Sequence, residues 1–221
     1  MSVQKKTEYA YVIEHMEEDE ATPKSLPPWV ELEYAHMITL AGQSARVHFT
    51  HLSQNSGRSL GERLASLGHT SASFEIHTDS ILAVLKEKNV PLSKVCLLDP
   101  KAEMALHPDD GQEFEWFLFG GILGDDPPRD RTSELRQLGF PTRHLDSVQM
   151  TTDTALGVTK RVIQDQVPLN NIPYIDFPTI KFNAKESVEM PFRYILQNES
   201  PLLPPGMREL LQEDLNKSFD F

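Results

Sequence analysis

Short apolar runs alternate with segments of helical periodicity along most of this chain, and this alternation constrains the fold more than any other feature. Several of the runs stop abruptly at glycine or at Asp-Pro, as strands do where they enter a turn. The expected strands are Tyr9–Ile13, Arg46–Leu52, Val95–Leu98, Phe114–Phe119, Thr142–Leu145 and Tyr174–Phe177. The expected helices cover residues 28–41, 60–67, 81–85, 130–138, 152–165 and 205–215. Strands that alternate with helices predict an α/β fold with a mostly parallel sheet and helices on both faces.

The chain changes character at about Pro168. Seven prolines fall between residues 168 and 205, where the strand and helix patterns fade. We therefore predict one α/β domain over residues 9–167 and a Pro-rich C-terminal extension over residues 168–221 that packs on its body.

The charge balance restricts the class of partner. The 221 residues carry a formal net charge of −12 and contain no run rich in lysine or arginine. Nucleic-acid binding usually requires a basic face that replaces the counterions of the phosphates, so a basic protein is the more natural partner. No apolar stretch is long enough to span a membrane. Cys96 is the only cysteine, which fits a reducing compartment, and we expect a cytoplasmic location.

The most unusual segment of the chain, Phe119–Thr132, directly follows an expected buried strand. Its three glycines would let the backbone approach a ligand closely, although it matches neither a dinucleotide-binding motif nor a P-loop. Two further loops, residues 98–100 and 145–152, also follow expected strands. A turn or a helix cap explains each of these loops alone. Together they predict one pocket at the ends of the strands.

Five blocks of this sequence resemble the SPOUT-type protein arginine methyltransferases of eukaryotes, a family that is also labelled as RNA methyltransferases. They occur in matching order, and the glycine-rich block is the most specific. The blocks are Val12–Glu18, Val95–Pro100, Phe119–Thr132, Gln149–Ala155 and Glu189–Tyr194. The first eight residues, Arg46–Asn89 and about the last 20 residues match poorly.

The resemblance implies a SPOUT fold whose trefoil knot spans about residues 94–167. It also implies that S-adenosylmethionine is the cofactor, S-adenosylhomocysteine the product, and an arginine of a small-subunit ribosomal protein the acceptor. Three loops of the knot would hold the cofactor. The residues expected to do so are Leu98, Asp99, Pro100, Phe119, Gly120, Gly121, Ile122, Gly124, Leu145, Gln149, Met150, Thr151 and Thr152.

Transfer to arginine would place particular demands on the acidic side chains. A guanidinium is charged and has no free lone pair, so nearby carboxylates would orient it and accept the proton it loses. The candidate catalytic residues are Asp125, Glu14, Glu17 and Asp130, and the candidate substrate-binding residues are Glu14, His15 and Arg129. Simpler interpretations stay open: Asp130 as a helix cap, Arg129 as a partner of neighbouring acids, and His15 as an ordinary polar residue at a strand end.

Two other functions stay open, an RNA methyltransferase of SPOUT type and a cofactor-binding module without catalysis. No metal is expected, because the chain lacks paired cysteines and an H-E-x-x-H motif, and His48 and His51 are expected to have surface or core roles. SPOUT enzymes are usually dimers. Here the Pro-rich extension is predicted to cover the dimer surface and leave a monomer.

Overall fold

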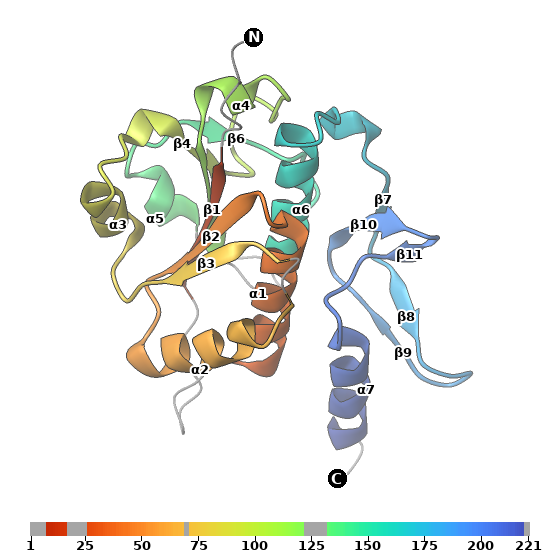
Figure 1. Cartoon of the computed structure of the whole chain (residues 1–221). Helices are drawn as coiled ribbons and strands as arrows, with labels where there is room; N and C mark the ends of the chain where they lie inside the picture. The colour runs from red at the N-terminus through yellow and green to blue at the C-terminus, as the bar shows by residue number, and fades with distance from the viewer. Residues whose placement is uncertain (1–7, 17–25, 69–70, 122–131, 219–221) are drawn as a thin grey trace.

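Six parallel strands form the central sheet (Figure 1). The computed structural model describes residues 8–16, 26–68, 71–121 and 132–218. The strand order is β3-β2-β1-β5-β4-β6, and every neighbouring pair is parallel. The strands are β1 (Tyr9–His15), β2 (Ala45–Thr50), β3 (Ser73–Ile76), β4 (Val95–Leu98), β5 (Trp116–Gly121) and β6 (Thr142–Arg143). The predicted α/β class with a mostly parallel sheet is therefore confirmed.

Helices cover both faces of this sheet. On one face Tyr11 and Ile13 join the larger core, to which α1 (Pro28–Ala41), α2 (Gln54–Ala65) and α6 (Thr152–Ile163) contribute. On the other face Val12 packs with Ile81 of α3 (Ile81–Glu87) and Leu135 of α5 (Thr132–Arg136). Burial on both faces explains why the central strands are nearly continuous apolar runs. A short helix, α4 (Asp110–Glu113), and the 3-10 turn η1 (Leu92–Lys94) flank β4.

The observed strands agree with most of the predicted ones to within two residues, but β3 was not predicted. It is an edge strand whose side chains are half-exposed or exposed, so it lacks the apolar run that marks β4 or β5. The helix expected at residues 60–67 is α2, which begins earlier, at Gln54. Its first turns are polar, and the Ser53 hydroxyl accepts a hydrogen bond from the Ser56 amide (3.1 Å) as an N-cap.

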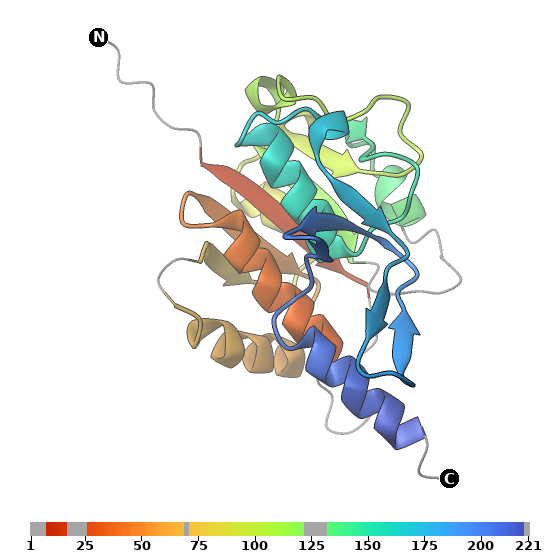
Figure 2. The same ribbon diagram turned by 90° about the vertical axis from the view of Figure 1, so that its right-hand side faces the viewer.

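The C-terminal residues form more regular structure than the expected extended tail. After η2 (Leu169–Asn171), the strands β7 (Tyr174–Asp176), β10 (Arg193–Gln197) and β11 (Ser200–Pro201) form an antiparallel sheet. The strands β8 (Thr179–Lys181) and β9 (Ser187–Glu189) form a hairpin, and the chain continues into α7 (Met207–Ser218). Figure 2 shows this segment, in blue, in front of α1 and α6.

The C-terminal segment has apolar contacts of two kinds. Ile195 of β10 belongs to the larger core of the central domain. Ile180, Met190, Phe192 and Tyr194 form a small core of their own. Of the seven prolines at residues 168–205, Pro201 lies in the edge strand β11 and the other six lie outside the strands, so a missing backbone N–H interrupts no ladder. The domain boundary at residue 168 stays a prediction.

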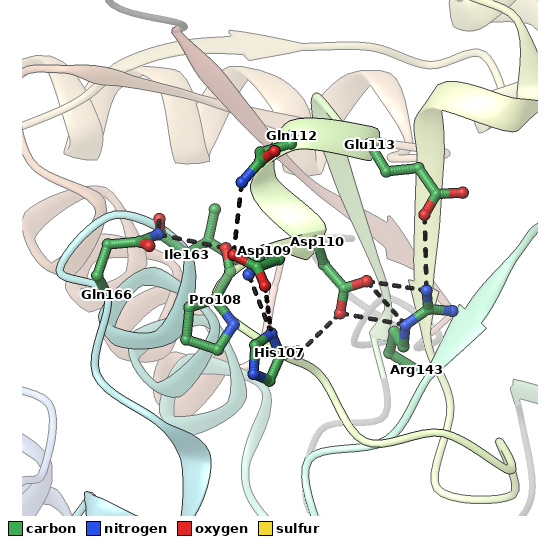
Figure 3. Close-up of polar contacts among 9 residues, drawn as sticks. All are labelled: His107, Pro108, Asp109, Asp110, Gln112, Glu113, Arg143, Ile163 and Gln166. Carbon is green, nitrogen blue, oxygen red and sulfur yellow. Dashed lines mark hydrogen bonds and ion pairs between the residues drawn. The ribbon is translucent and has the colours of Figure 1, made fainter.

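An ion pair ties the segment after β4 to β6 (Figure 3). Arg143 donates from Nη2 and Nε to Asp110 Oδ1 at 2.8 and 3.0 Å, and Asp110 also accepts from the His107 amide at 2.8 Å. The guanidinium lies over the Phe114 ring, 5.1 Å from its centroid. The side chains of Arg143 and Asp110 are only 11% and 8% exposed, so the attraction between them offsets the cost of burying each charge.

We expect Arg143→Met to lower the free energy of unfolding by about 3–5 kcal/mol, because it leaves the Asp110 carboxylate buried without its cation. Urea denaturation at neutral pH measures this. The matched control is Lys160→Met, whose partner Asp165 is 42% exposed, so a loss within about 1 kcal/mol is expected. Equal losses in the two variants would contradict this account of the pair.

Candidate functional site

A pocket of about 300 Å³ opens at the carboxyl ends of β4 and β5, beside the loop after β6 and the N-terminus of α6. Ligand sites of parallel α/β sheets form at this edge. The pocket is lined by Leu98, Asp99, Pro100, Lys101, Phe119, Gly120, Thr132, Leu145, Asp146, Ser147, Val148, Gln149, Met150, Thr152 and Ala155.

Nine residues predicted to bind a cofactor line this one pocket. They are Leu98, Asp99, Pro100, Phe119, Gly120, Leu145, Gln149, Met150 and Thr152. Gly121 and Thr151 are not part of the lining, and Ile122 and Gly124 lie outside the described residues. The structure thus brings the three predicted loops together.

Six lining residues were not predicted individually. Lys101 directly follows one predicted loop, Asp146, Ser147 and Val148 fall within another, and Ala155 lies one helical turn further along α6. Periodicity at the start of this helix could have identified Ala155. Thr132, the first residue of α5, is the last residue of the predicted segment Phe119–Thr132.

The walls combine an apolar surface with the polar end of a helix. Leu98, Phe119, Met150 and Ala155 supply apolar side chains that suit a flat aromatic ring. The first turn of α6, beginning at Thr152, presents backbone amides without helical acceptors, and this end of a helix favours a negative charge. The site can therefore hold a ligand that carries both a ring and a carboxylate.

Asp99 shapes the first loop through its side chain. It is 2% exposed, and Oδ1 accepts hydrogen bonds from Arg136 Nη2 at 2.8 Å and from the Lys101 amide at 2.9 Å. These bonds join the loop after β4 to α5. The carboxylate thus holds the loop in place, which leaves the backbone of residues 98–101 to face a ligand.

Arg193, from the C-terminal segment, supports the third loop. Its Nη1 donates to Asp146 Oδ2 at 2.7 Å, and its Nε and Nη2 donate to the two oxygens of Asp176 at 2.6 and 2.9 Å. Its backbone amide donates to the Gln149 carbonyl at 2.8 Å, and its guanidinium lies over the Tyr174 ring. Asp146 has a positive φ of 99°, a strained conformation for a residue other than glycine. Contacts from outside the loop are therefore needed to hold it.

These ion pairs also change the acidity of the partners. A hydrogen bond from the Ser147 amide, together with Arg193, holds the pKa of Asp146 below its usual range. The hydrogen bonds from Arg193 likewise lower the pKa of Asp176 and raise that of Arg193. All three groups are therefore charged at neutral pH.

Glu14 and His15 lie beside the pocket in the sheet, but they do not line it. Glu14 pairs with Gly120 in the β1–β5 register, yet its carboxylate accepts hydrogen bonds from the Thr50 hydroxyl and from the Ile81 amide at the start of α3. Burial raises the pKa of Glu14, although these two hydrogen bonds oppose the shift. His15 Nδ1 lies 2.7 Å from the Tyr34 hydroxyl. The catalytic role of Glu14 and the substrate-binding roles of both residues stay predictions.

Gly121 lies at the end of β5, beside the pocket, where a larger residue would not fit. A Cβ atom at this position would lie 2.7 Å from the Glu14 carbonyl oxygen, closer than two such atoms can approach. The end of β5 therefore requires a glycine there. Glu17, Asp125, Arg129 and Asp130, the other predicted catalytic and substrate-binding residues, lie outside the described residues.

Comparisons with known proteins agree on one family. Residues 10–218 match the family model described as protein arginine N-methyltransferase SFM1-like. The protein arginine N-methyltransferase SFM1 of Saccharomyces cerevisiae is 40% identical over 219 residues, which cover 95% of this chain and 97% of that protein.

Solved structures of the yeast arginine methyltransferase SFM1 share the fold. The complex with SAM has a TM-score of 0.80 and 38% identity and covers 94% of this chain and 91% of that one. The complex with SAH has a TM-score of 0.78 and 38% identity and covers 91% and 93%. The predicted SPOUT class of fold is confirmed. The trefoil knot stays a prediction, because residues 122–131 of its path lie outside the described residues.

We expect Arg193→Met to accelerate amide hydrogen exchange in residues 146–150 at least about tenfold, because the loop loses the cation that holds Asp146. Exchange followed by mass spectrometry measures this. The control is Arg161→Met, because Arg161 reaches the same C-terminal segment through a hydrogen bond of 3.5 Å to Gln197, which lies outside the loop. If exchange in the loop were unchanged in Arg193→Met, the ion pair would not support the loop.

Proposed function

This chain belongs to the SFM1-like family of protein arginine N-methyltransferases, and we propose that it transfers a methyl group from S-adenosylmethionine to an arginine side chain of a basic ribosomal protein. The observation that carries the proposal is the pocket itself. Three loops that the sequence singles out as the cofactor site meet around one cavity at the carboxyl edge of the sheet. We infer that this cavity is the cofactor site.

The lining of the pocket fits S-adenosylmethionine. The apolar side chains of Leu98, Phe119 and Met150 can enclose an adenine ring, and the free amides at the start of α6 can bind the carboxylate of its methionine part. Gly120 and residues 98–101 also line the pocket, and we propose that their backbone groups hydrogen-bond the ring edge and the ribose. The cofactor supplies an electrophilic methyl group on a positively charged sulfur.

Acidic side chains perform the remaining chemistry. The new bond joins a guanidinium nitrogen to the methyl carbon, the bond from that carbon to sulfur breaks, and the nitrogen loses one proton. A carboxylate beside the guanidinium holds it in line by charge-assisted hydrogen bonds and accepts the proton. We propose Asp125 for this role, with Glu17 and Asp130 as further acids and Arg129 as a substrate contact.

Glu14 is a second candidate for the carboxylate that binds the guanidinium and accepts its proton. Its carboxylate is buried and binds Thr50 and the start of α3, so it would first have to leave these partners to contact a guanidinium. Burial raises the pKa of Glu14, which makes its carboxylate a stronger base and so a better proton acceptor. His15, whose Nδ1 lies 2.7 Å from the Tyr34 hydroxyl, is a candidate substrate contact.

The acidity of the whole chain supports a basic protein as the acceptor. A formal charge of −12 attracts a lysine- and arginine-rich protein and repels RNA. We propose a small-subunit ribosomal protein in the cytoplasm, and a monomeric enzyme whose C-terminal segment lies along α1 and α6. None of the described helices is both long and apolar enough to cross a membrane.

The test is a transfer assay with radiolabelled S-adenosylmethionine. The purified chain is incubated with ribosomal subunits and, in parallel, with extracted ribosomal RNA. We expect label in a small basic protein, resistant to ribonuclease and recovered as methylarginine after hydrolysis. Label in RNA would replace the proposal with the RNA methyltransferase alternative. Cofactor binding without transfer to either fraction would support the binding module.

Replacing the proposed base separates catalysis from binding. We expect Asp125→Asn to lower kcat by roughly 10²-fold or more while the affinity for S-adenosylmethionine changes little, because the amide cannot accept the proton. The matched control is Asp126→Asn, which removes the same charge from the adjacent position. Equal losses in both variants would mean that the charge of the loop, and not Asp125 as a base, is what matters.

A further inference from the structure

Three potential metal ligands meet at the edge of the sheet formed by β2 and β3. His48 belongs to β2, Glu75 to β3, and His77 follows β3 directly. Within the described ranges they are the only group of this kind whose ligand atoms all lie within 4.8 Å of one another. They lie on the opposite side of β1 and β5 from β4 and β6, so this cluster is separate from the proposed methyltransferase site.

The three ligand atoms form a triangle of suitable size. His48 Nδ1 and His77 Nε2 are 3.2 Å apart, and Glu75 Oε2 is 3.8 and 3.6 Å from these two nitrogens. A tetrahedral zinc ion with bonds of about 2.0–2.1 Å requires its ligand atoms to be about 3.4 Å apart. The observed distances deviate from this value by only a few tenths of an ångström, and the two rings would have to rotate so that both nitrogens face one point.

Both imidazoles are neutral, as ligands must be. Burial lowers the pKa of His48 to about 4 and also lowers the pKa of His77. The ring of His48 stacks on that of Trp116, with centroids 4.7 Å apart, which fixes its orientation. Each neutral ring carries one lone pair, and the 3.2 Å contact between His48 Nδ1 and His77 Nε2 is a hydrogen bond, so one of these two nitrogens carries a proton that must move to the other nitrogen of its ring before both can bind an ion.

The backbone holds the ligands in register. His48 is paired directly with Glu75 in the parallel β2–β3 ladder, so both side chains project from the same face of the sheet. The His77 amide donates to the Phe49 carbonyl at 2.8 Å, which continues the ladder by one residue. The exposed fraction rises from 1% for His48 to 16% for His77 and 32% for Glu75, so solvent reaches the cluster from the carboxylate side.

Two cationic side chains already form ion pairs with the Glu75 carboxylate. Lys88 Nζ lies 2.7 Å from Glu75 Oε2, and Arg46 Nη1 lies 3.0 Å from Oε1. A bound metal would have to displace Lys88 from this oxygen or share it. His48 Nε2 also has no hydrogen-bond partner among the described residues, so nothing there orients the far side of this ring. Both features predict an affinity below that of a structural zinc finger.

We propose that His48, Glu75 and His77 bind a zinc-like divalent cation, with water at a fourth position. The ion would fasten β3, which has only β2 as a neighbour, to the body of the sheet. It would also stabilise the turn that leads into α3, because the His77 carbonyl accepts from the Leu52 amide at 3.2 Å and the Asp79 carbonyl from the His51 amide at 2.9 Å. This proposal does not depend on methyl transfer.

The test is a titration of the full chain, first stripped with a chelator, with Zn²⁺ in competition with a coloured chelator. A parallel titration with Co²⁺ follows the visible absorption of tetrahedral cobalt. We expect one ion per chain, with affinity at least about tenfold weaker in His77→Ala and Glu75→Gln. His107→Ala, which removes an exposed histidine paired with Asp109, should bind as the unchanged chain does.

A fourth variant distinguishes a lost ligand from a damaged fold. Lys88→Met removes the cation that competes for Glu75, so zinc should bind about fivefold tighter or more, and a merely destabilised protein would show no such gain. Binding that is absent in the unchanged chain would overturn the proposal. Binding that persists in His77→Ala, or that fails to tighten in Lys88→Met, would overturn it as well.

Discussion

The parallel pairing of β5 between β1 and β4 is the constraint on which the rest of the structure depends. Leu118 lies opposite Val12 on one side and Leu97 on the other, and all three side chains face the same core. Because the pairings are parallel, the three strands end at one edge of the sheet. The loops that follow β4 and β5 must therefore meet there, and the α6 N-terminus closes the pocket between them.

The features that could be predicted from the sequence are those for which burial determines the local composition. Strands covered on both faces are continuous apolar runs, which is why Val95–Leu98 was predicted with its observed bounds. The edge strand β3 and the hairpin strands β8 and β9 bury few of their side chains, and the prolines of the C-terminal segment suggested an extended tail. Pairing, and not composition, makes these segments strands.

The positions of the site residues were easier to predict than their side-chain partners. Nine predicted residues line the pocket because they lie at or after the ends of β4 and β5, or between the end of β6 and the first turn of α6, and the sequence marks these boundaries. The direction of Glu14 could have been inferred from strand periodicity, since it lies two residues after Val12 and faces the same core. The contact of Arg193 with Asp146 could not, because 47 residues separate the two.

A crystal structure of the chain with S-adenosylhomocysteine would show whether this pocket binds the methyl donor. We expect the adenine between residues 98–101 and the loop at 145–150, with the carboxylate at the first turn of α6. Density for the ligand at any other place, or a pocket that stays filled only by water at saturating ligand, would contradict it.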